Sequence, residues 1–143
     1  MKFEVFTVDD DKIITLVHKK MVLKSNFHVN PLSFLNGKDA LDYILNNNSI
    51  EKTYCILLDI NMPLMNGWEF LDAINQSKIA ARILVFMVTS SVDKVDIEKA
   101  KTYPLVIDFL EKPISLKILE ELKKHDTLRT FFDPICNDLI SPM

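Results

Sequence analysis

Short apolar runs alternate with amphipathic stretches along the whole chain. Runs such as FEVFTV and ILVFMVT are typical of strands, because most of their positions are apolar or β-branched. The stretches between them repeat apolar residues at intervals of three and four, which predicts helices; the first carries Ile13, Leu16, Val17 and Met21. The pattern predicts strands at residues 3–8, 29–34, 54–59, 83–89 and 106–110, and helices at residues 12–25, 37–46, 68–77, 92–101 and 115–125.

Five strands that alternate with five helices indicate the α/β class and a doubly wound parallel sheet with helices on both faces. The strand at 83–89 is almost entirely apolar, as expected for a strand that is covered on both sides. Pro31 has no backbone N–H to donate, so the strand at 29–34 is expected at an edge of the sheet. Ser115 is the expected N-cap of the last helix.

Length and composition fit one packed domain. The chain has 143 residues, of which 48% are hydrophobic, and a net charge of -3. We expect the domain to span residues 1–125, followed by a C-terminal extension of undefined role at residues 126–143. The basic residues form no dense run, so direct binding to nucleic acid is not expected. No apolar run is long enough for a membrane span, and the acidic N-terminal segment is unlike a secretion signal, so we expect a cytoplasmic protein.

Cysteine and glycine usage narrows the possible chemistry. Cys55 opens an apolar strand and is expected to be a buried thiol, and neither it nor Cys136 belongs to a metal-binding motif. The two glycines, Gly37 and Gly67, are too few for a dinucleotide-binding turn or a P-loop. A phosphate group would therefore have to be held by side chains.

Polar side chains gather where four of the predicted strands end. Because the carboxyl ends of parallel strands share one edge, where open α/β sheets bind ligands, these side chains are expected to meet. Each alone has a simpler explanation, since acidic and hydroxyl residues after a strand often cap the next helix; Asp11 fits that role best. Their joint occurrence favours a functional site. The set is Asp9, Asp10, Asp59, Thr89, Ser90, Ser91 and Lys112.

The carboxylates of this set point to a cation and an anion. Three carboxylates in one place repel each other, and burial increases the cost. A divalent cation relieves the repulsion, and an all-oxygen donor set favours Mg²⁺. With Mg²⁺ on one side of Asp59 and the Lys112 ammonium on the other, the site suits an anion with several oxygens, such as a phosphoryl group.

Four motifs carry a resemblance to a known family. VDDD, LLDINMPLMNG, VTSS and FLEKP, in this order, resemble the receiver domain of two-component response regulators, and the similarity runs from about residue 3 to residue 125. Asp59 and Thr89 are thirty residues apart and Thr89 and Lys112 twenty-three, close to the spacing in that family. The resemblance implies a flavodoxin-like five-stranded sheet of order 2-1-3-4-5 with five helices.

The resemblance also implies a role for each acidic residue. Asp59 would be the phosphoacceptor, which takes a phosphoryl group from a phosphohistidine on a histidine kinase or a histidine phosphotransfer protein. Asp10 and Asp59 would bind Mg²⁺ directly, and Asp9 would assist. The backbone carbonyl of Asn61 would supply a further ligand.

The remaining motif residues would assist the transfer. Lys112 would pair with the phosphoryl oxygens, and Thr89 would form a hydrogen bond with one of them. The bond between Lys112 and Pro113 is typically cis in the family. Pro63 and Gly67 would shape the loop after the acceptor.

Signal output in the family comes from a switch. Thr89 would move toward the phosphoryl group, and the aromatic side chain at the position of Phe109 would rotate inward. Phe109 lacks the hydroxyl group of the tyrosine found in many relatives, so a plain core aromatic explains it equally well. The bulky segment at residues 103–106 is also unusual. The face made by the fourth helix, fifth strand and fifth helix would bind an unknown downstream protein or form a homodimer.

Two other functions stay open. A phosphohydrolase of the haloacid dehalogenase type also uses an aspartate after an apolar strand, but needs a second aspartate where this chain has Asn61. A receiver-like binding module that acts without phosphorylation would not need the complete acidic set and Lys112. Because about eighteen residues follow His125, we expect a stand-alone receiver that catalyses only its own phosphorylation and dephosphorylation.

Overall fold

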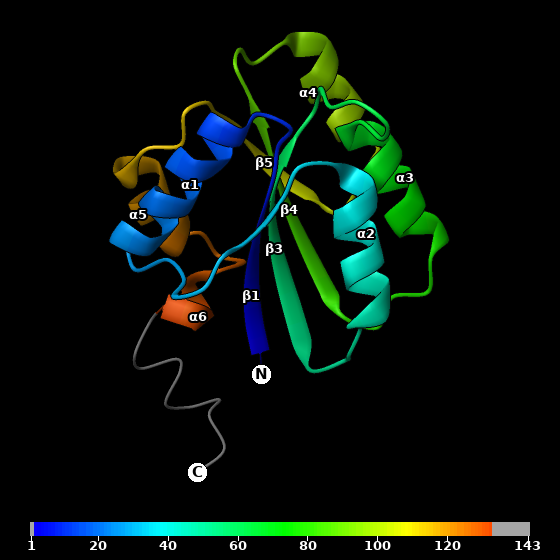
Figure 1. Ribbon diagram of the computed structural model, residues 1–143, viewed down its shortest axis with the longest axis horizontal. Helices are drawn as coiled ribbons and strands as arrows, with labels where there is room; N and C mark the ends of the chain where they lie inside the picture. The colour runs from blue at the N-terminus through cyan, green and yellow to red at the C-terminus, as the bar shows by residue number, and fades with distance from the viewer. Residues whose placement is uncertain (1, 133–143) are drawn as a thin grey trace.

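The computed structural model describes residues 2–132, and a parallel sheet of five strands forms their centre (Figure 1). Strands and helices alternate in the order that the hydrophobic pattern predicts. The strands are β1 (Lys2–Val8), β2 (Leu32–Phe34), β3 (Lys52–Asp59), β4 (Arg82–Thr89) and β5 (Val106–Glu111). The helices are α1 (Lys12–Lys24), α2 (Gly37–Asn46), α3 (Gly67–Gln76), α4 (Lys94–Ala100), α5 (Leu116–Lys123) and α6 (Arg129–Phe132).

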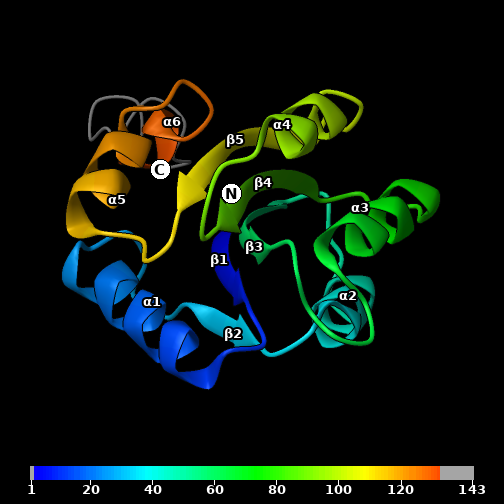
Figure 2. The same ribbon diagram turned by 90° about the horizontal axis from the view of Figure 1, so that it is seen from above.

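The strand order is β2-β1-β3-β4-β5, and every neighbouring pair is parallel. Seen from above, α1 and α5 cover one face of the sheet and α2, α3 and α4 the other (Figure 2). The expected flavodoxin-like fold is confirmed. The parallel arrangement brings the carboxyl ends of all strands to one edge, which fixes where the functional site can lie.

Two apolar cores flank the sheet because successive strand residues point to opposite faces. In β4, Val85 and Met87 belong to the core beneath α2 and α3, while Leu84 and Phe86 belong to the core beneath α1 and α5. Seven of the eight residues of β4 are buried, which confirms the strand that was expected to be covered on both sides. Cys55 is a buried free thiol, as expected.

Helices α1 to α5 begin at side-chain caps, and two of these caps, Asp11 and Ser115, were expected from the sequence. Asp11 accepts hydrogen bonds from the backbone N–H groups of Ile13 at 2.9 Å and Ile14 at 3.2 Å, and Ser115 accepts one from Ile118 at 3.2 Å. Such caps satisfy N–H groups that have no partner within the helix. The N-caps of α1 to α5 are Asp11, Asn36, Asn66, Asp93 and Ser115.

One strand and one added helix differ most from the hydrophobic pattern. The edge strand β2 has three residues instead of six, and Val29 before it is 88% exposed. A sixth, short helix, α6, follows α5 and lies beside the start of β1 (Figure 1). Its Phe131 ring stacks on Phe3 with centroids 4.4 Å apart. The rest of the expected extension, residues 133–143 with Cys136, lies outside the described residues.

The bulky segment before β5 contacts α3. The Tyr103 hydroxyl donates a hydrogen bond to Asp72 at 2.7 Å, and its ring lies 5.5 Å from the Trp68 ring. The Lys99 ammonium of α4 lies 4.9 Å from the centre of the same Trp68 ring. Tyr103 therefore joins the end of α4 to the start of α3. No helix in residues 2–132 has both the length and the apolar content that a membrane crossing requires.

The start of α3 has no room for a side chain at Gly67. A Cβ atom there would lie 2.6 Å from the backbone oxygen of Asp59, so we expect Gly67→Ala to lower the free energy of unfolding by about 1–3 kcal/mol. Gly37 is the matched control, because it also begins a helix and its added Cβ would meet Met65 only at 3.2 Å. The better helix propensity of alanine should keep the cost of Gly37→Ala under about 1 kcal/mol. Urea unfolding followed by Trp68 fluorescence measures both; equal losses would contradict the prediction.

Candidate functional site

The predicted polar residues meet at the carboxyl edge of the sheet. Asp9 directly follows β1, Asp59 and Thr89 are the last residues of β3 and β4, and Lys112 directly follows β5. They line one cavity of about 370 Å³. The complete lining is Asp9, Asp10, Asp11, Asp59, Asn61, Thr89, Ser90, Ser91 and Lys112.

Three carboxylates form the acidic side of this cavity. Asp9, Asp10 and Asp59 each offer one oxygen, and these oxygens all lie within 4.8 Å of one another. Asp9 is 3% and Asp59 is 5% exposed, while Asp10 faces solvent. Asp9 uses its Oδ1 to accept the N–H of Asp11 at 2.9 Å. Hard oxygen donors at this spacing fit a divalent cation such as Mg²⁺.

Lys112 bridges the two buried carboxylates. Its Nζ lies 2.7 Å from Asp9 Oδ2 and 3.1 Å from Asp59 Oδ1, and its side chain is 14% exposed. Burial alone would lower the pKa of the Lys112 ammonium, but its hydrogen bonds to Asp9 and Asp59 raise the pKa above the usual value. The ammonium therefore stays charged beside Asp59 Oδ1.

The Asp59 carboxylate is held in an unfavourable setting for its charge. Burial raises the pKa of Asp59, and the nearby Asp9 carboxylate raises it further, whereas Lys112 opposes both effects. Four aspartates and a single lysine line this cavity. The excess negative charge is the electrostatic reason why a cation would bind here.

Thr89 and Phe109 lie on the same face of the sheet. Val85, Met87 and Thr89 alternate along β4, and Phe109 pairs with Met87 in the neighbouring strand. The Thr89 hydroxyl donates a hydrogen bond to the carbonyl of Ser91 at 3.0 Å. Phe109, on β5, is half-buried and packs against the core beneath α2 and α3.

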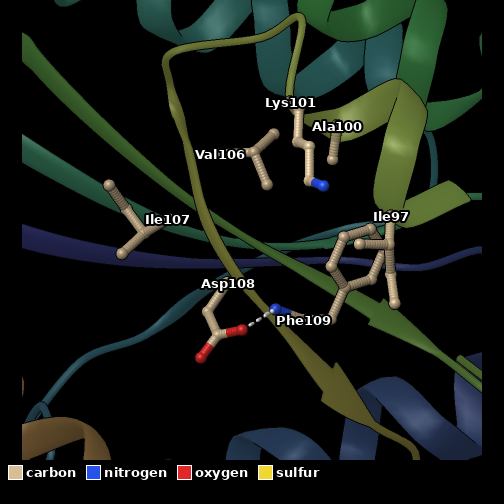
Figure 3. A pocket seen from close by; sticks show the side chains of 7 residues that line it. All are labelled: Ile97, Ala100, Lys101, Val106, Ile107, Asp108 and Phe109. Atoms are coloured by element: carbon tan, nitrogen blue, oxygen red, sulfur yellow. Dashed lines mark hydrogen bonds between the residues drawn. The ribbon is translucent and has the colours of Figure 1, made fainter.

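The Phe109 ring borders a second, smaller cavity between α4 and β5. Its volume is about 180 Å³, and Figure 3 shows Phe109 beside Ile97 of α4, with Lys101 above them. Asp108 points the other way and accepts the N–H of Phe109 at 2.8 Å. Phe109 therefore lies between the carboxyl end of β4 and the surface of helix α4.

The loop after β3 and the loop after β5 shape the site. Gly67 N–H donates to the carbonyl of Ile60 at 2.8 Å, and Pro63 accepts the N–H of Met65 at 2.8 Å, which folds this loop tightly. The bond between Lys112 and Pro113 is cis, as the motif predicts. Each residue that the sequence assigned to the site is therefore at the cavity or in a loop that forms its wall, with Phe109 behind it.

One residue near the site, His18, was not expected from the sequence patterns. It is 2% exposed on α1, and its Nε2 accepts the backbone N–H of Ile114 at 3.0 Å. Ile114 lies two residues after Lys112. In the structure His18 is on the buried face of α1, whereas Ile13 and Leu16, whose spacing helped to predict this helix, are exposed, so only the fold shows that His18 lies beside the loop after β5.

Comparisons with known proteins agree with this fold. The family model described as "Response regulator receiver domain" matches residues 5–124. The 3',5'-cyclic-nucleotide phosphodiesterase regA of Dictyostelium discoideum is 30% identical over 129 residues, which are 89% of this chain and 15% of that protein. The hybrid signal transduction histidine kinase I of the same organism is 30% identical over 122 residues, 83% of this chain and 7% of that protein. The chain thus spans only a small part of these two relatives.

A solved structure gives the same result. A response regulator receiver protein from Dyadobacter fermentans superimposes with a TM-score of 0.74 and 31% identity, covering 85% of this chain and 95% of that one. The chain belongs to the response regulator receiver domain family of two-component signalling.

The excess negative charge around Asp59 should lower the free energy of unfolding. We expect Asp59→Asn to raise the free energy of unfolding by about 0.5–2 kcal/mol in the absence of metal, because it removes a buried negative charge while Lys112 keeps Asp9. The pKa of Asp59 is higher in the folded chain than its usual 3.8. The destabilising charge is therefore present at neutral pH and is lost as the pH falls through the raised pKa.

Urea titrations at a series of pH values, from neutral pH to below the raised pKa of Asp59, test that expectation. The advantage of Asp59→Asn should shrink toward acidic pH, and adding Mg²⁺ should stabilise the wild type more than the variant. Asp108→Asn is the matched control: Asp108 is exposed, and an asparagine there can still accept the N–H of Phe109, so its effect should stay within about 0.5 kcal/mol. A destabilised Asp59→Asn variant would show that the carboxylate is needed for folding.

Proposed function

We propose that this chain is a phosphorylation-dependent signalling switch whose phosphoacceptor is Asp59. The observation that carries the proposal is the position of Lys112, whose ammonium bridges Asp9 and Asp59 in a cavity with three carboxylates. This arrangement offers one nucleophilic oxygen between a fixed cation and a site suited to a second cation. Phosphoryl transfer needs such positioning and charge neutralisation more than it needs covalent chemistry from the protein.

Asp9, Asp10 and Asp59, with the carbonyl of Asn61, would hold Mg²⁺, which when bound neutralises charge on the phosphoryl oxygens. The phosphodonor is a phosphohistidine of a histidine kinase or a histidine phosphotransfer protein. A carboxylate oxygen of Asp59 attacks phosphorus, the P–N bond breaks, and the electron pair leaves with the imidazole nitrogen. After the transfer, Lys112 pairs with the phosphoryl group. The phosphoryl oxygens then carry the negative charge that the lysine neutralises.

Output follows from Thr89 and Phe109. The Thr89 hydroxyl turns from the Ser91 carbonyl to a phosphoryl oxygen, and Phe109 moves into the space that becomes free. The surface that changes is made by α4, β5 and α5, where a downstream protein or a second copy of the chain binds. Residues 1–125 form the signalling domain, and residues 126–143 form an extension of it. The protein acts in the cytoplasm, without direct contact to nucleic acid or membrane, and turns over no external substrate.

Two competing functions make different predictions at the same site. A phosphohydrolase of the haloacid dehalogenase type would release phosphate from many phosphate esters, and Asp59→Asn would abolish that turnover. A binding module that acts without phosphorylation would bind its partner equally well with and without a phosphodonor. The bridging lysine and the complete acidic set favour the switch over both.

Labelling with a small phosphodonor tests the proposal directly. Incubation with Mg²⁺ and acetyl phosphate should add one phosphoryl group to the wild type, detected by intact-mass analysis, and peptide mapping should place it on Asp59. Asp59→Ala should remain unlabelled, and chelation of Mg²⁺ should prevent labelling of the wild type. Asp108→Asn should be labelled like the wild type. Labelling of Asp59→Ala would refute the assignment.

The homodimer can be tested on the α4 surface. Lys101 borders the same cavity as Phe109, so Lys101→Glu would reverse a charge on the surface where a second copy of the chain would bind. We expect beryllofluoride and Mg²⁺ to produce a dimer in sedimentation velocity, and Lys101→Glu to weaken it by tenfold or more. Lys38→Glu on α2 is the matched control, because Lys38 is 65% and Lys101 is 66% exposed and each pairs with an acid of its own helix. A monomer in the presence of beryllofluoride would contradict the dimer.

A further inference from the structure

His18 joins two segments that are far apart in the sequence. It lies on the buried face of α1, and its Nε2 accepts the N–H of Ile114, ninety-six residues later, at 3.0 Å. Ile114 is itself 2% exposed and packs in the core beneath α1 and α5. A buried backbone N–H with an imidazole acceptor is a specific contact, since a buried N–H group without a partner is unfavourable.

This hydrogen bond requires one form of the imidazole. Nε2 can accept only when it carries no proton, so the ring is neutral and its proton is on Nδ1. The surroundings agree with that form. Burial lowers the pKa of His18, and Lys112 adds to the lowering, while Asp9 acts in the opposite direction.

The contact matters because of what Ile114 follows. The loop after β5 is held before and after its lysine: the Lys112 N–H donates to the Thr89 carbonyl at 2.8 Å, and the Ile114 N–H donates to His18. Between these two points lie the Lys112 side chain and Pro113. The distances of 2.7 Å and 3.1 Å from Lys112 to the two carboxylates therefore depend on both anchors.

We propose that His18 is a positioning residue that holds the loop of Lys112 so that its ammonium faces Asp59. The proposal rests on the proposed function, because it assigns His18 a role in phosphoryl transfer through Lys112. His18 acts without contact to the phosphoryl group. A side chain without an acceptor at this position leaves the Ile114 N–H unpaired, and the loop moves to find another partner.

The kinetic test compares two substitutions in two backgrounds. His18→Leu removes the acceptor, and His18→Gln provides a carbonyl oxygen in its place. With acetyl phosphate and saturating Mg²⁺, we expect His18→Leu to slow labelling of Asp59 by roughly tenfold to a hundredfold, and His18→Gln to restore most of the rate. In the Lys112→Ala background the same His18→Leu change should slow labelling by less than about twofold, because the group it positions is gone.

Two further measurements separate positioning from general loss of structure. His28→Leu is the matched control: His28 also joins distant segments, since its Nε2 contacts the Phe3 carbonyl at 2.8 Å, but this contact is at the start of β1. It should leave the labelling rate unchanged. Mg²⁺ affinity, measured by calorimetry, should not fall in His18→Leu, because the carboxylates stay in place and a displaced Lys112 ammonium would leave them more negative. Equal slowing by His18→Leu in both backgrounds would overturn the proposal.

Nuclear magnetic resonance provides a readout without phosphorylation. Long-range correlations of the imidazole nitrogens should show the His18 proton on Nδ1, and the Ile114 amide resonance should move in His18→Leu but little in His18→Gln. A His18 ring protonated at Nε2 would overturn the proposal even if His18→Leu failed to fold. If the wild type is not labelled at Asp59, the proposed function fails as well. If the wild type is labelled and His18→Leu is labelled equally fast, only the role of His18 is refuted.

Discussion

The bridge from Lys112 to Asp9 and Asp59 is the interaction around which this molecule is organised. Buried carboxylates are costly unless a cation lies close to them, and the single lysine lies 2.7 Å and 3.1 Å from two of them. A third carboxylate, Asp10, remains near them at the solvent edge. The folded chain therefore keeps a negative excess at the end of its central strands. That excess opposes the stability of the folded chain, and its three carboxylates could hold a metal ion.

The rest of the fold holds these charges in place. Because the sheet is parallel, β1, β3, β4 and β5 all end at the same edge. The residues at these four strand ends form the site. Gly67 lets the start of α3 approach the backbone of Asp59, and a cis bond precedes Pro113 after the lysine. The two apolar cores on either side of the sheet make this edge rigid, since β3 and β4 are buried almost along their full length. A rigid support is what a transfer reaction that relies on positioning needs.

Two side-chain contacts, those of Tyr103 and His18, connect helices to segments near the site. Tyr103 joins the end of α4 to Trp68 and Asp72 of α3, where a smaller residue would leave a gap. His18 connects α1 to the loop after β5. Both contacts link helices to segments next to the charged edge.

The sequence alone determined the order of elements, the fold class and the polar set, because the hydrophobic period of each segment and the residue that ends each strand are local properties. It also identified the caps Asp11 and Ser115, which act within one helical turn. Only the tertiary structure shows that Lys112 contacts both buried carboxylates. It also decided the partners of His18 and Tyr103, the short β2 and the addition of α6. These depend on contacts between residues that are tens of positions apart, and no periodicity within a segment carries information about such distances.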